Sequence, residues 1–387
     1  MPRHPFVQYA ATRLYTGAID YSPDGNLIAH VTNTTGQFNL WTIPSGGGIP
    51  RQLTALMDST VRQFNWSPDG SYLIYQADEN GDEFHQLYRL PALGGWGEKF
   101  TTNPTAQHSI NGYGFSHDGR YFAYSANDVI PENQDAVIMD METGELQRPF
   151  PTGDGLYIPI VWSKDGRYLA AIAATSNMNS NSFLYDRQTG EVKNVTPHEG
   201  ASNFYPVAFA PDSSGFYLAT DHEREFTGLA FYSIADGTWA YVETPDADIE
   251  NYALSKDGTR MIWCVNEGGR SRLYGRDLVS GAALTLPDLP LGVIGGMALS
   301  PDGERLALTL GRPTEASNLY EFFLETGKLI PLGQSMIGGI DPAEMLDPEL
   351  IAYPTFDGRQ IPAWLYRPKG EGKFPVILSI HGGPDAQ

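Results

Sequence analysis

The sequence is poor in cysteine and in positive charge, and each shortage excludes a class of protein. Its single cysteine, Cys264, rules out a disulfide framework, and the surrounding apolar run MIWCVN predicts a buried, unreactive thiol. Lysine and arginine number 25 against 46 aspartates and glutamates, which gives a formal net charge of −21. Such a charge repels polyanions, so we expect no binding to nucleic acid.

Long apolar runs are also missing. No stretch reaches the ~18 apolar residues that a membrane-spanning helix requires, and the first 17 residues lack the apolar core of a signal peptide.

The eight histidines and the lone cysteine never take the spacing of zinc ligands, and the glycine-rich residues 46–51 lack the lysine of a phosphate-binding loop. We therefore expect a soluble, cytoplasmic protein with no membrane contact, no metal and no other cofactor.

A short phrase of the form Ser-Pro-Asp-Gly, flanked by apolar runs, recurs seven times with small variations. Proline presets the backbone of the first central residue, aspartate can bond its own backbone, and glycine supplies a positive φ, so each copy predicts a hairpin. The aspartates of the copies lie 45 to 49 residues apart and are Asp24, Asp69, Asp118, Asp165, Asp212, Asp257 and Asp302.

The period of the phrase and the strands around it predict a propeller. A third apolar strand follows each turn, and a short fourth strand completes the unit, as at residues 190–196. Units of about 40 to 50 residues with four strands are typical of propeller blades. We predict an all-β fold, a seven-bladed β-propeller of four-stranded blades over residues 1–340, and not a β-sandwich, which would not require constant spacing. Trp66 and Trp162 are expected to pack between blades.

Residues 341–387 carry a different pattern. Extended segments on either side of FDGRQ predict a hairpin. Phe374–Ile380 is apolar at nearly every position, as in a parallel strand that is covered on both faces. Because such a strand needs crossover helices, we interpret residues 341–387 as the first strands of an incomplete α/β-hydrolase domain.

The motif His-Gly-Gly-Pro at residues 381–384 directly follows that apolar segment. In α/β-hydrolases a loop of this kind offers a backbone N–H to the oxyanion of the reaction. Gly383, or else Gly382, is the candidate donor. His381 and Pro384 are expected to support the loop and not to act in catalysis.

With this motif the sequence resembles the prolyl oligopeptidase family of serine peptidases, especially its acylaminoacyl-peptidase and dipeptidyl-peptidase-like branches. The segment FDGRQIPAWLYRPKGEGKFPVILSIHGGPDAQ carries the resemblance, and the blades look like those of TolB-like and peptidase-associated propellers. The resemblance implies a propeller that screens substrates by size and a hydrolase domain that cleaves short peptides through an acyl-enzyme. Peptides are therefore the expected partners.

The family's Gly-x-Ser-x-Gly motif, and its later aspartate and histidine, have no match after residue 340. Since a catalytic serine needs a positioned base, we expect the triad to lie outside this chain and the chain alone to be inactive. A non-catalytic TolB-like scaffold that binds protein partners is the alternative, and ester cleavage is a third. The sequence leaves the peptide specificity, the oligomeric state, the role of residues 1–15 and any continuation past Gln387 undetermined.

Two charged clusters, at residues 77–88 and 221–226, are further candidates for a metal site or a substrate site. The spacing of the carboxylates in the first does not fit an EF-hand loop, and no substrate role is assigned to Asp82 or Glu83. Both clusters are predicted to be solvated hairpin tips.

Overall fold

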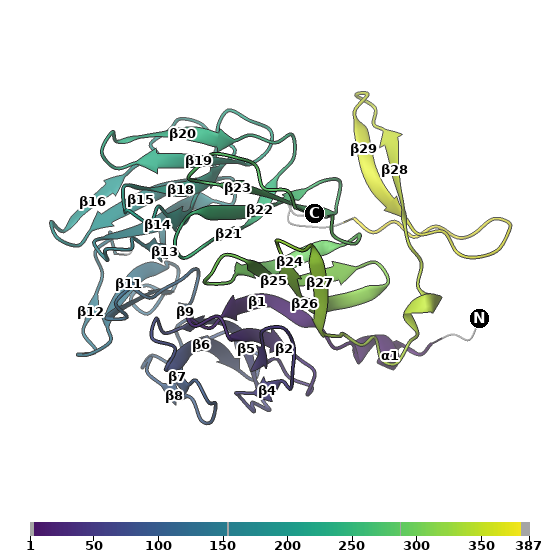
Figure 1. Ribbon diagram of the computed structural model, residues 1–387, viewed down its shortest axis with the longest axis horizontal. Coiled ribbons are helices and arrows are strands. Elements are labelled where there is room, and N and C mark those ends of the chain that lie inside the picture. The colour runs from purple at the N-terminus through teal and green to yellow at the C-terminus, as the bar shows by residue number, and fades with distance from the viewer. Residues whose placement is uncertain (1–3, 153–154, 287, 381–387) are drawn as a thin grey trace.

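Seven small antiparallel sheets form a ring, and a separate hairpin follows them (Figure 1). The structure is a computed structural model that describes residues 4–152, 155–286 and 288–380. Within these residues the helical elements are the short helix α1 (Phe6–Ala10) and the 3-10 turn η1 (Pro342–Glu344). The prediction of an all-β, seven-bladed propeller is confirmed.

Each sheet consists of strands that are consecutive in the chain. The first sheet holds β1 (Tyr15–Tyr21), β2 (Leu27–Thr32), β3 (Asn39–Pro44) and β4 (Arg51–Gln52). The second holds β5 (Ser59–Trp66), β6 (Tyr72–Glu79), β7 (Gln86–Pro91) and β8 (Glu98–Lys99). The third holds β9 (His108–Ser109), β10 (Tyr121–Ala126), β11 (Asp135–Asp140) and β12 (Leu146–Gln147). The fourth holds β13 (Leu156–Trp162), β14 (Tyr168–Ser176), β15 (Asn179–Asp186) and β16 (Glu191–Asn194).

The later sheets follow the same order. The fifth holds β17 (Phe204–Phe209), β18 (Gly215–Thr220), β19 (Gly228–Ser233) and β20 (Thr238–Glu243). The sixth holds β21 (Ile249–Leu254), β22 (Arg260–Asn266) and β23 (Ser271–Asp277). The seventh holds β24 (Val293–Leu299), β25 (Arg305–Arg312), β26 (Glu315–Phe323) and β27 (Lys328–Gly333). The hairpin consists of β28 (Glu349–Pro354) and β29 (Gln360–Leu365), as predicted around FDGRQ.

The sixth sheet differs from the others in its outer edge, because three regular strands are present within the described residues. Residues 282–284 lie where a fourth strand would be. Leu284 N donates to Gly275 O at 2.8 Å, and Arg276 forms an isolated bridge with Ala283. The edge of β23 is therefore partly paired, although the segment is too irregular to count as a strand.

The recurring turns connect the first and second strands of the sheets. In the first turn Ser22 Oγ donates to Asp24 Oδ1 at 2.5 Å, Asp24 Oδ1 accepts from Asn26 N at 3.1 Å, and Gly25 has a φ of 72°. The fifth turn is the exception: Ala210 replaces the serine, and Ser213 takes the glycine position with a φ of 58°. The predicted turn chemistry is thus present with one local departure.

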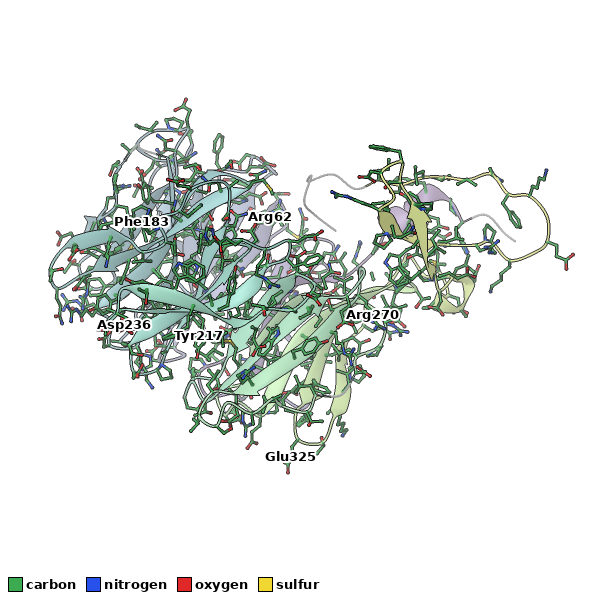
Figure 2. The ribbon with its side chains drawn as sticks, turned by 90° about the horizontal axis from the view of Figure 1, so that it is seen from above. Arg62, Phe183, Tyr217, Asp236, Arg270 and Glu325 are labelled. Atoms are coloured by element: carbon green, nitrogen blue, oxygen red, sulfur yellow. The ribbon has the colours of Figure 1, made fainter. Side chains whose placement is uncertain are left out.

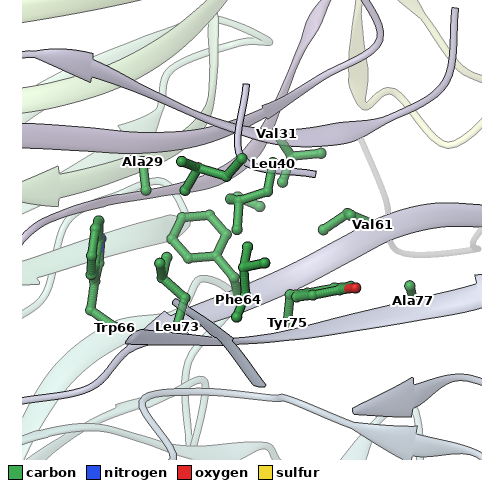
Figure 3. Packing of buried hydrophobic residues seen from close by; sticks show 12 residues of the cluster. Ala29, Val31, Leu40, Val61, Phe64, Trp66, Leu73, Tyr75 and Ala77 are labelled. Atoms are coloured by element: carbon green, nitrogen blue, oxygen red, sulfur yellow. The ribbon is translucent and has the colours of Figure 1, made fainter. Parts of the chain in front are cut away.

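The apolar core lies between neighbouring sheets. Buried side chains form seven clusters, and each cluster draws its members from two adjacent sheets. Figure 3 shows the cluster between the first and second sheets, in which Ala29, Val31 and Leu40 of the first sheet lie opposite Phe64, Leu73 and Tyr75 of the second. Trp162 Nε1 donates at 2.8 Å to Gly114 O, in the connection between β9 and β10 of the third blade. Trp66, which belongs to the cluster between the first and second sheets, and Trp162 therefore pack between blades, as expected.

The first and seventh sheets meet without sharing a strand. Ile19 and Ile28 of the first sheet pack against Ala307 and Leu319 of the seventh. The backbones approach closely nearby, since a Cβ on Gly17 would lie 2.2 Å from Gly295 O. The ring is therefore closed by side-chain packing, and glycine is required at this contact.

Glu321 of β26 adds a polar contact at the same junction. Its carboxylate is fully buried and accepts hydrogen bonds from Tyr21 Oη at 2.8 Å, Ser45 Oγ at 2.6 Å and Gly46 N at 2.6 Å. The guanidinium of Arg305 lies 3.8 Å away. Burial and the neighbouring carboxylate together raise the pKa of Tyr21. One side chain thus links the last sheet to the end of β1 and to the turn that follows β3.

The N-terminal segment lies along the connection between the ring and the hairpin (Figure 1). Arg13 and Met336 exchange backbone hydrogen bonds of 2.7 and 3.0 Å. His4 Nε2 lies 3.0 Å from Glu344 Oε2.

Among the described residues, none of the helices has the length and apolar character that a membrane span requires.

Candidate functional site

Phe374–Ile380 does not form the strand predicted for it. The segment has no regular secondary structure, and Val376, Ile377 and Leu378 are 88%, 93% and 75% exposed. A parallel strand depends on hydrogen-bonded neighbouring strands, and no strand of the described residues pairs with this segment. The start of a hydrolase sheet is therefore not observed. His381, Gly382, Gly383 and Pro384 lie outside the described residues, so their predicted roles remain predictions.

The β28–β29 hairpin forms a cavity of about 300 Å³ with the sixth and seventh sheets. Leu350 and Trp364 are directly opposite in the hairpin register. Leu350 lies against the β22–β23 loop, because a Cβ on Gly268 would be 3.6 Å from its Cδ2. In Figure 2, Arg270 of that loop lies on the side of the propeller nearest the hairpin. The hairpin thus positions Trp364 over the ends of two blades.

The cavity wall is mostly apolar and carries one cation. Leu291, Val293, Pro313, Pro348 and Trp364 supply apolar surface, and Arg312 supplies the charge. Sequence reasoning predicted the hairpin but missed this cavity. The available signal was the spacing of Trp364 and Tyr366, since residues two apart in an extended segment point to the same side.

The acidic cluster at residues 77–88 forms the tip between β6 and β7, as predicted. Asn80 and Glu83 adopt positive φ in an exposed turn. Asp78 differs from the expectation of a solvated carboxylate, because it is 1% exposed. It accepts hydrogen bonds from Thr60 N at 3.0 Å and from Arg62 at 3.2 Å. Asp78 therefore holds β5 to β6.

The cluster at residues 221–226 connects β18 to β19. Asp221 Oδ1 accepts from Asn203 N at 2.7 Å, and Arg224 donates to Pro245 O at 2.6 Å. The guanidinium also lies 5.6 Å from the centre of the Tyr241 ring. These hydrogen bonds connect neighbouring loops, so the cluster has a structural role.

Ser202 and His222 form a serine–histidine contact in the fifth blade, with Ser202 Oγ 3.2 Å from His222 Nδ1. Ser202 is only 5% exposed. The His222 ring lies within 6 Å of the rings of Phe204 and Trp239, at 5.5 and 5.8 Å. A nucleophile must reach its substrate, so the buried Ser202 is not a candidate for catalysis.

Cys264 is fully buried, as predicted. Burial raises the pKa of its thiol to about 11, so the reactive thiolate is scarce at neutral pH. Among the residues that the structure describes, no group of three or more His, Cys, Asp or Glu side chains is placed to hold a metal ion.

Comparison with known proteins gave relatives that are peptidases. No family model matches the chain. The chain is 26% identical to the uncharacterized peptidase YuxL of Bacillus subtilis (strain 168) over 451 aligned positions, which cover 94% of this chain and 64% of YuxL. A shorter match, 27% identical over 129 residues, links 33% of the chain to 18% of dipeptidyl aminopeptidase BIII of Pseudoxanthomonas mexicana. The chain therefore spans less than two thirds of the length of these relatives.

Solved structures of prolyl oligopeptidases share the fold. One of the prolyl endopeptidases studied for inter-domain dynamics superimposes with a TM-score of 0.70 at 14% identity, over 90% of this chain and 54% of that one. Prolyl oligopeptidase B of Galerina marginata gives a TM-score of 0.71 at 14% identity, over 92% and 55%. The predicted resemblance is confirmed: the chain is similar in sequence to the peptidases YuxL and dipeptidyl aminopeptidase BIII, and in fold to prolyl oligopeptidases.

Proposed function

We propose that this chain is the substrate-gating propeller portion of a serine peptidase that hydrolyses short peptides through an acyl-enzyme. The observation that carries the proposal is the extent of the match to peptidase YuxL, which covers 94% of the chain. Since the propeller's last sheet ends at Gly333, a match of that extent includes residues beyond the blades. A propeller used only as a scaffold gives no reason for such an extension.

The ring supports a gating role on physical grounds. Its first strands pack against one another around the axis, as β1 does against β5 and β24. Seven buried clusters hold neighbouring sheets together, and Glu321 adds a buried polar contact at the closure. A folded protein would have to separate these contacts to pass the ring, whereas an extended peptide would not. Size selection then follows from the stability of the ring.

The proposal extends to the residues around the end of the chain. Residues 341–387 would begin an α/β-hydrolase domain, with Gly383, or else Gly382, as an oxyanion donor. The nucleophile, acid and base would lie outside this chain, so the chain alone would not hydrolyse peptides. We expect the protein to act in the cytoplasm, a reducing compartment in which proteins rarely depend on disulfide bonds.

The test compares this chain with the complete product of its gene. We expect the complete product to react with a fluorophosphonate probe and to cleave short fluorogenic peptides, but not a folded protein that contains the same cleavage sequence. This chain alone should show neither labelling nor cleavage. A complete product that is not labelled and cleaves nothing would contradict the proposal and favour a scaffold. Cleavage of nitrophenyl esters without cleavage of peptides would favour an esterase.

A further inference from the structure

The cavity beneath the hairpin has the size and the lining of a small-ligand site. Its volume of about 300 Å³ is at the lower end for such sites, which suits one or two residues of a peptide and not a folded partner. Trp364 and Pro348 form one wall, and Leu291 and Pro313 lie in the wall supplied by the blades. An apolar side chain that entered between them would lose its contact with water.

Arg312 gives the cavity a polar partner that is poorly satisfied within the protein. Its NH1 lies 3.5 Å from Glu315 Oε1, which is longer than a good charge-assisted hydrogen bond. Its Nε is buried and has no hydrogen-bond partner among the described residues. The side chain is 32% exposed, and Arg312 is part of the cavity lining. An oxygen of a ligand would accept a hydrogen bond from the exposed part of the guanidinium, which Glu315 binds only at long distance.

Gly311 leaves room beside Arg312. A Cβ at this position would meet only ordinary contacts at 3.9 and 4.0 Å, and the backbone does not have the positive φ that favours glycine. The local backbone therefore tolerates a side chain, and a large one would take up cavity space. Gly311→Leu is for this reason a direct way to fill the cavity.

We infer that this cavity is a subsite for an apolar, preferably aromatic, residue of a short peptide, with Arg312 donating to an oxygen of that peptide. The inference rests on the proposed function for the choice of a peptide as ligand. The oxygen is either a backbone carbonyl within the peptide or the carboxylate at its C-terminus. Both offer the same acceptor chemistry next to an apolar side chain.

Calorimetric titration of this chain with four peptides tests the inference. The probes are acetyl-Ala-Phe-Ala-amide, acetyl-Ala-Ala-Ala-amide, acetyl-Ala-Ala-Phe-amide and acetyl-Ala-Ala-Phe with a free C-terminus. We expect the phenylalanine peptides to bind more tightly than the alanine peptide. Tighter binding of the free acid than of its amide would identify the carboxylate as the partner of Arg312, and equal binding would identify a backbone carbonyl.

Three variants connect the binding to the cavity. Gly311→Leu and Trp364→Ala should abolish the preference for phenylalanine, and Arg312→Gln should weaken binding by about tenfold or more. Arg51→Gln removes an exposed arginine of β4, outside the cavity wall, and should change nothing. Thermal unfolding of each variant establishes that it folds. If Gly311→Leu does not fold, Trp364→Ala decides, since it alters the hairpin and not the ring.

The inference is overturned if phenylalanine and alanine peptides bind equally, or if all three cavity variants bind like the wild type. Its failure is distinguishable from failure of the proposed function. A complete gene product that cleaves peptides, together with a cavity that binds none, contradicts only the subsite. A cavity that binds phenylalanine peptides, in a complete product that cleaves nothing, contradicts only the peptidase.

Discussion

At the residue scale, Asp20 in β1 has an unusual environment for a carboxylate. Burial raises its pKa to about 7, although a hydrogen bond from Tyr21 N and the charge of Lys256 act in the opposite direction. An aspartate in an unfolded chain has a pKa of about 3.9. The folded state therefore binds the proton more tightly than the unfolded state. This residue's contribution to stability is present below about pH 4 and is lost as the pH rises through 7.

We predict that Asp20→Asn raises the melting temperature at pH 8 and has much less effect at pH 4, because the amide never ionises. Thermal unfolding followed by circular dichroism at the two pH values measures this. Asp288→Asn is the matched control, since the Asp288 side chain is 83% exposed, and it should show no such pH dependence. A stabilisation by Asp20→Asn that is equal at both pH values would show that the charge of Asp20 is not the cause.

At the scale of the element, glycine is the fourth residue of every recurring turn between first and second strands except the fifth, which has Ser213 there. Gly166 in the fourth turn has a φ of 67°, and a Cβ added there would meet no other group within 4 Å, so only the backbone angle opposes a larger residue. Ser213, at the same position of the fifth turn, adopts this left-handed conformation with a φ of 58° although it has a side chain. A non-glycine residue in this region costs about 1 to 2 kcal/mol.

We predict that Gly166→Ala lowers the free energy of unfolding by about 1 to 2 kcal/mol. Ser213→Gly should raise it by up to ~1 kcal/mol, because relief of strain is partly offset by the greater freedom of glycine in the unfolded chain. Urea unfolding of the two variants checks both signs. Destabilisation by Ser213→Gly would mean that the hydrogen bond from Asp165 N to Ser213 Oγ, at 3.3 Å, outweighs the strain.

At the scale of the whole molecule, the ring closes where the chain's first and last sheets meet. We predict that Glu321→Ala destabilises the protein by about 3 to 5 kcal/mol, because the hydroxyls of Tyr21 and Ser45 lose their acceptor and Arg305 loses a buried countercharge. Glu321→Gln should cost less, since an amide oxygen still accepts hydrogen bonds. The measurement is the free energy of unfolding in urea.

Glu325→Ala is the control for the closure, since Glu325 is an exposed glutamate in the turn between β26 and β27 (Figure 2). It should leave stability within experimental error of the wild type. Equal stability of Glu321→Ala and Glu325→Ala would show that apolar packing alone closes the ring. The contacts of Ile19 and Ile28 with Ala307 and Leu319 would then be sufficient.

Much of the fold was predictable because short sequence motifs determine its turns and strands, and these motifs recur along the chain. A turn such as Ser22 to Gly25 contains its own hydrogen bonds and its own glycine, so four residues specify a hairpin wherever they occur. The repeat spacing then predicts a ring, since no single sheet buries both of its faces. Cys264, Trp66 and Trp162 were predictable for the same reason, because each lies inside or beside an apolar strand.

The candidate site was much less predictable, because its residues meet only through the arrangement of the chain in space. Arg312 and Trp364 belong to different elements, and no local pattern indicates that the hairpin turns back over the blades. Phe374–Ile380 illustrates the opposite case: its composition predicts a covered strand, but a strand requires a paired neighbour, and no strand of the described chain pairs with it. The roles predicted for residues 381–384 lie outside the described residues.

By itself, the sequence determined the number of blades, the turns that build them and the apolar residues that pack between them, because these features depend on neighbours in the chain and on a constant period. Tertiary structure alone decided how the ring closes and where a cavity forms. Glu321 meets Tyr21 and Ser45 only because seven sheets of this width bring the two ends of the propeller together. Contacts between residues hundreds of positions apart depend on the geometry of the whole ring, which no short segment specifies.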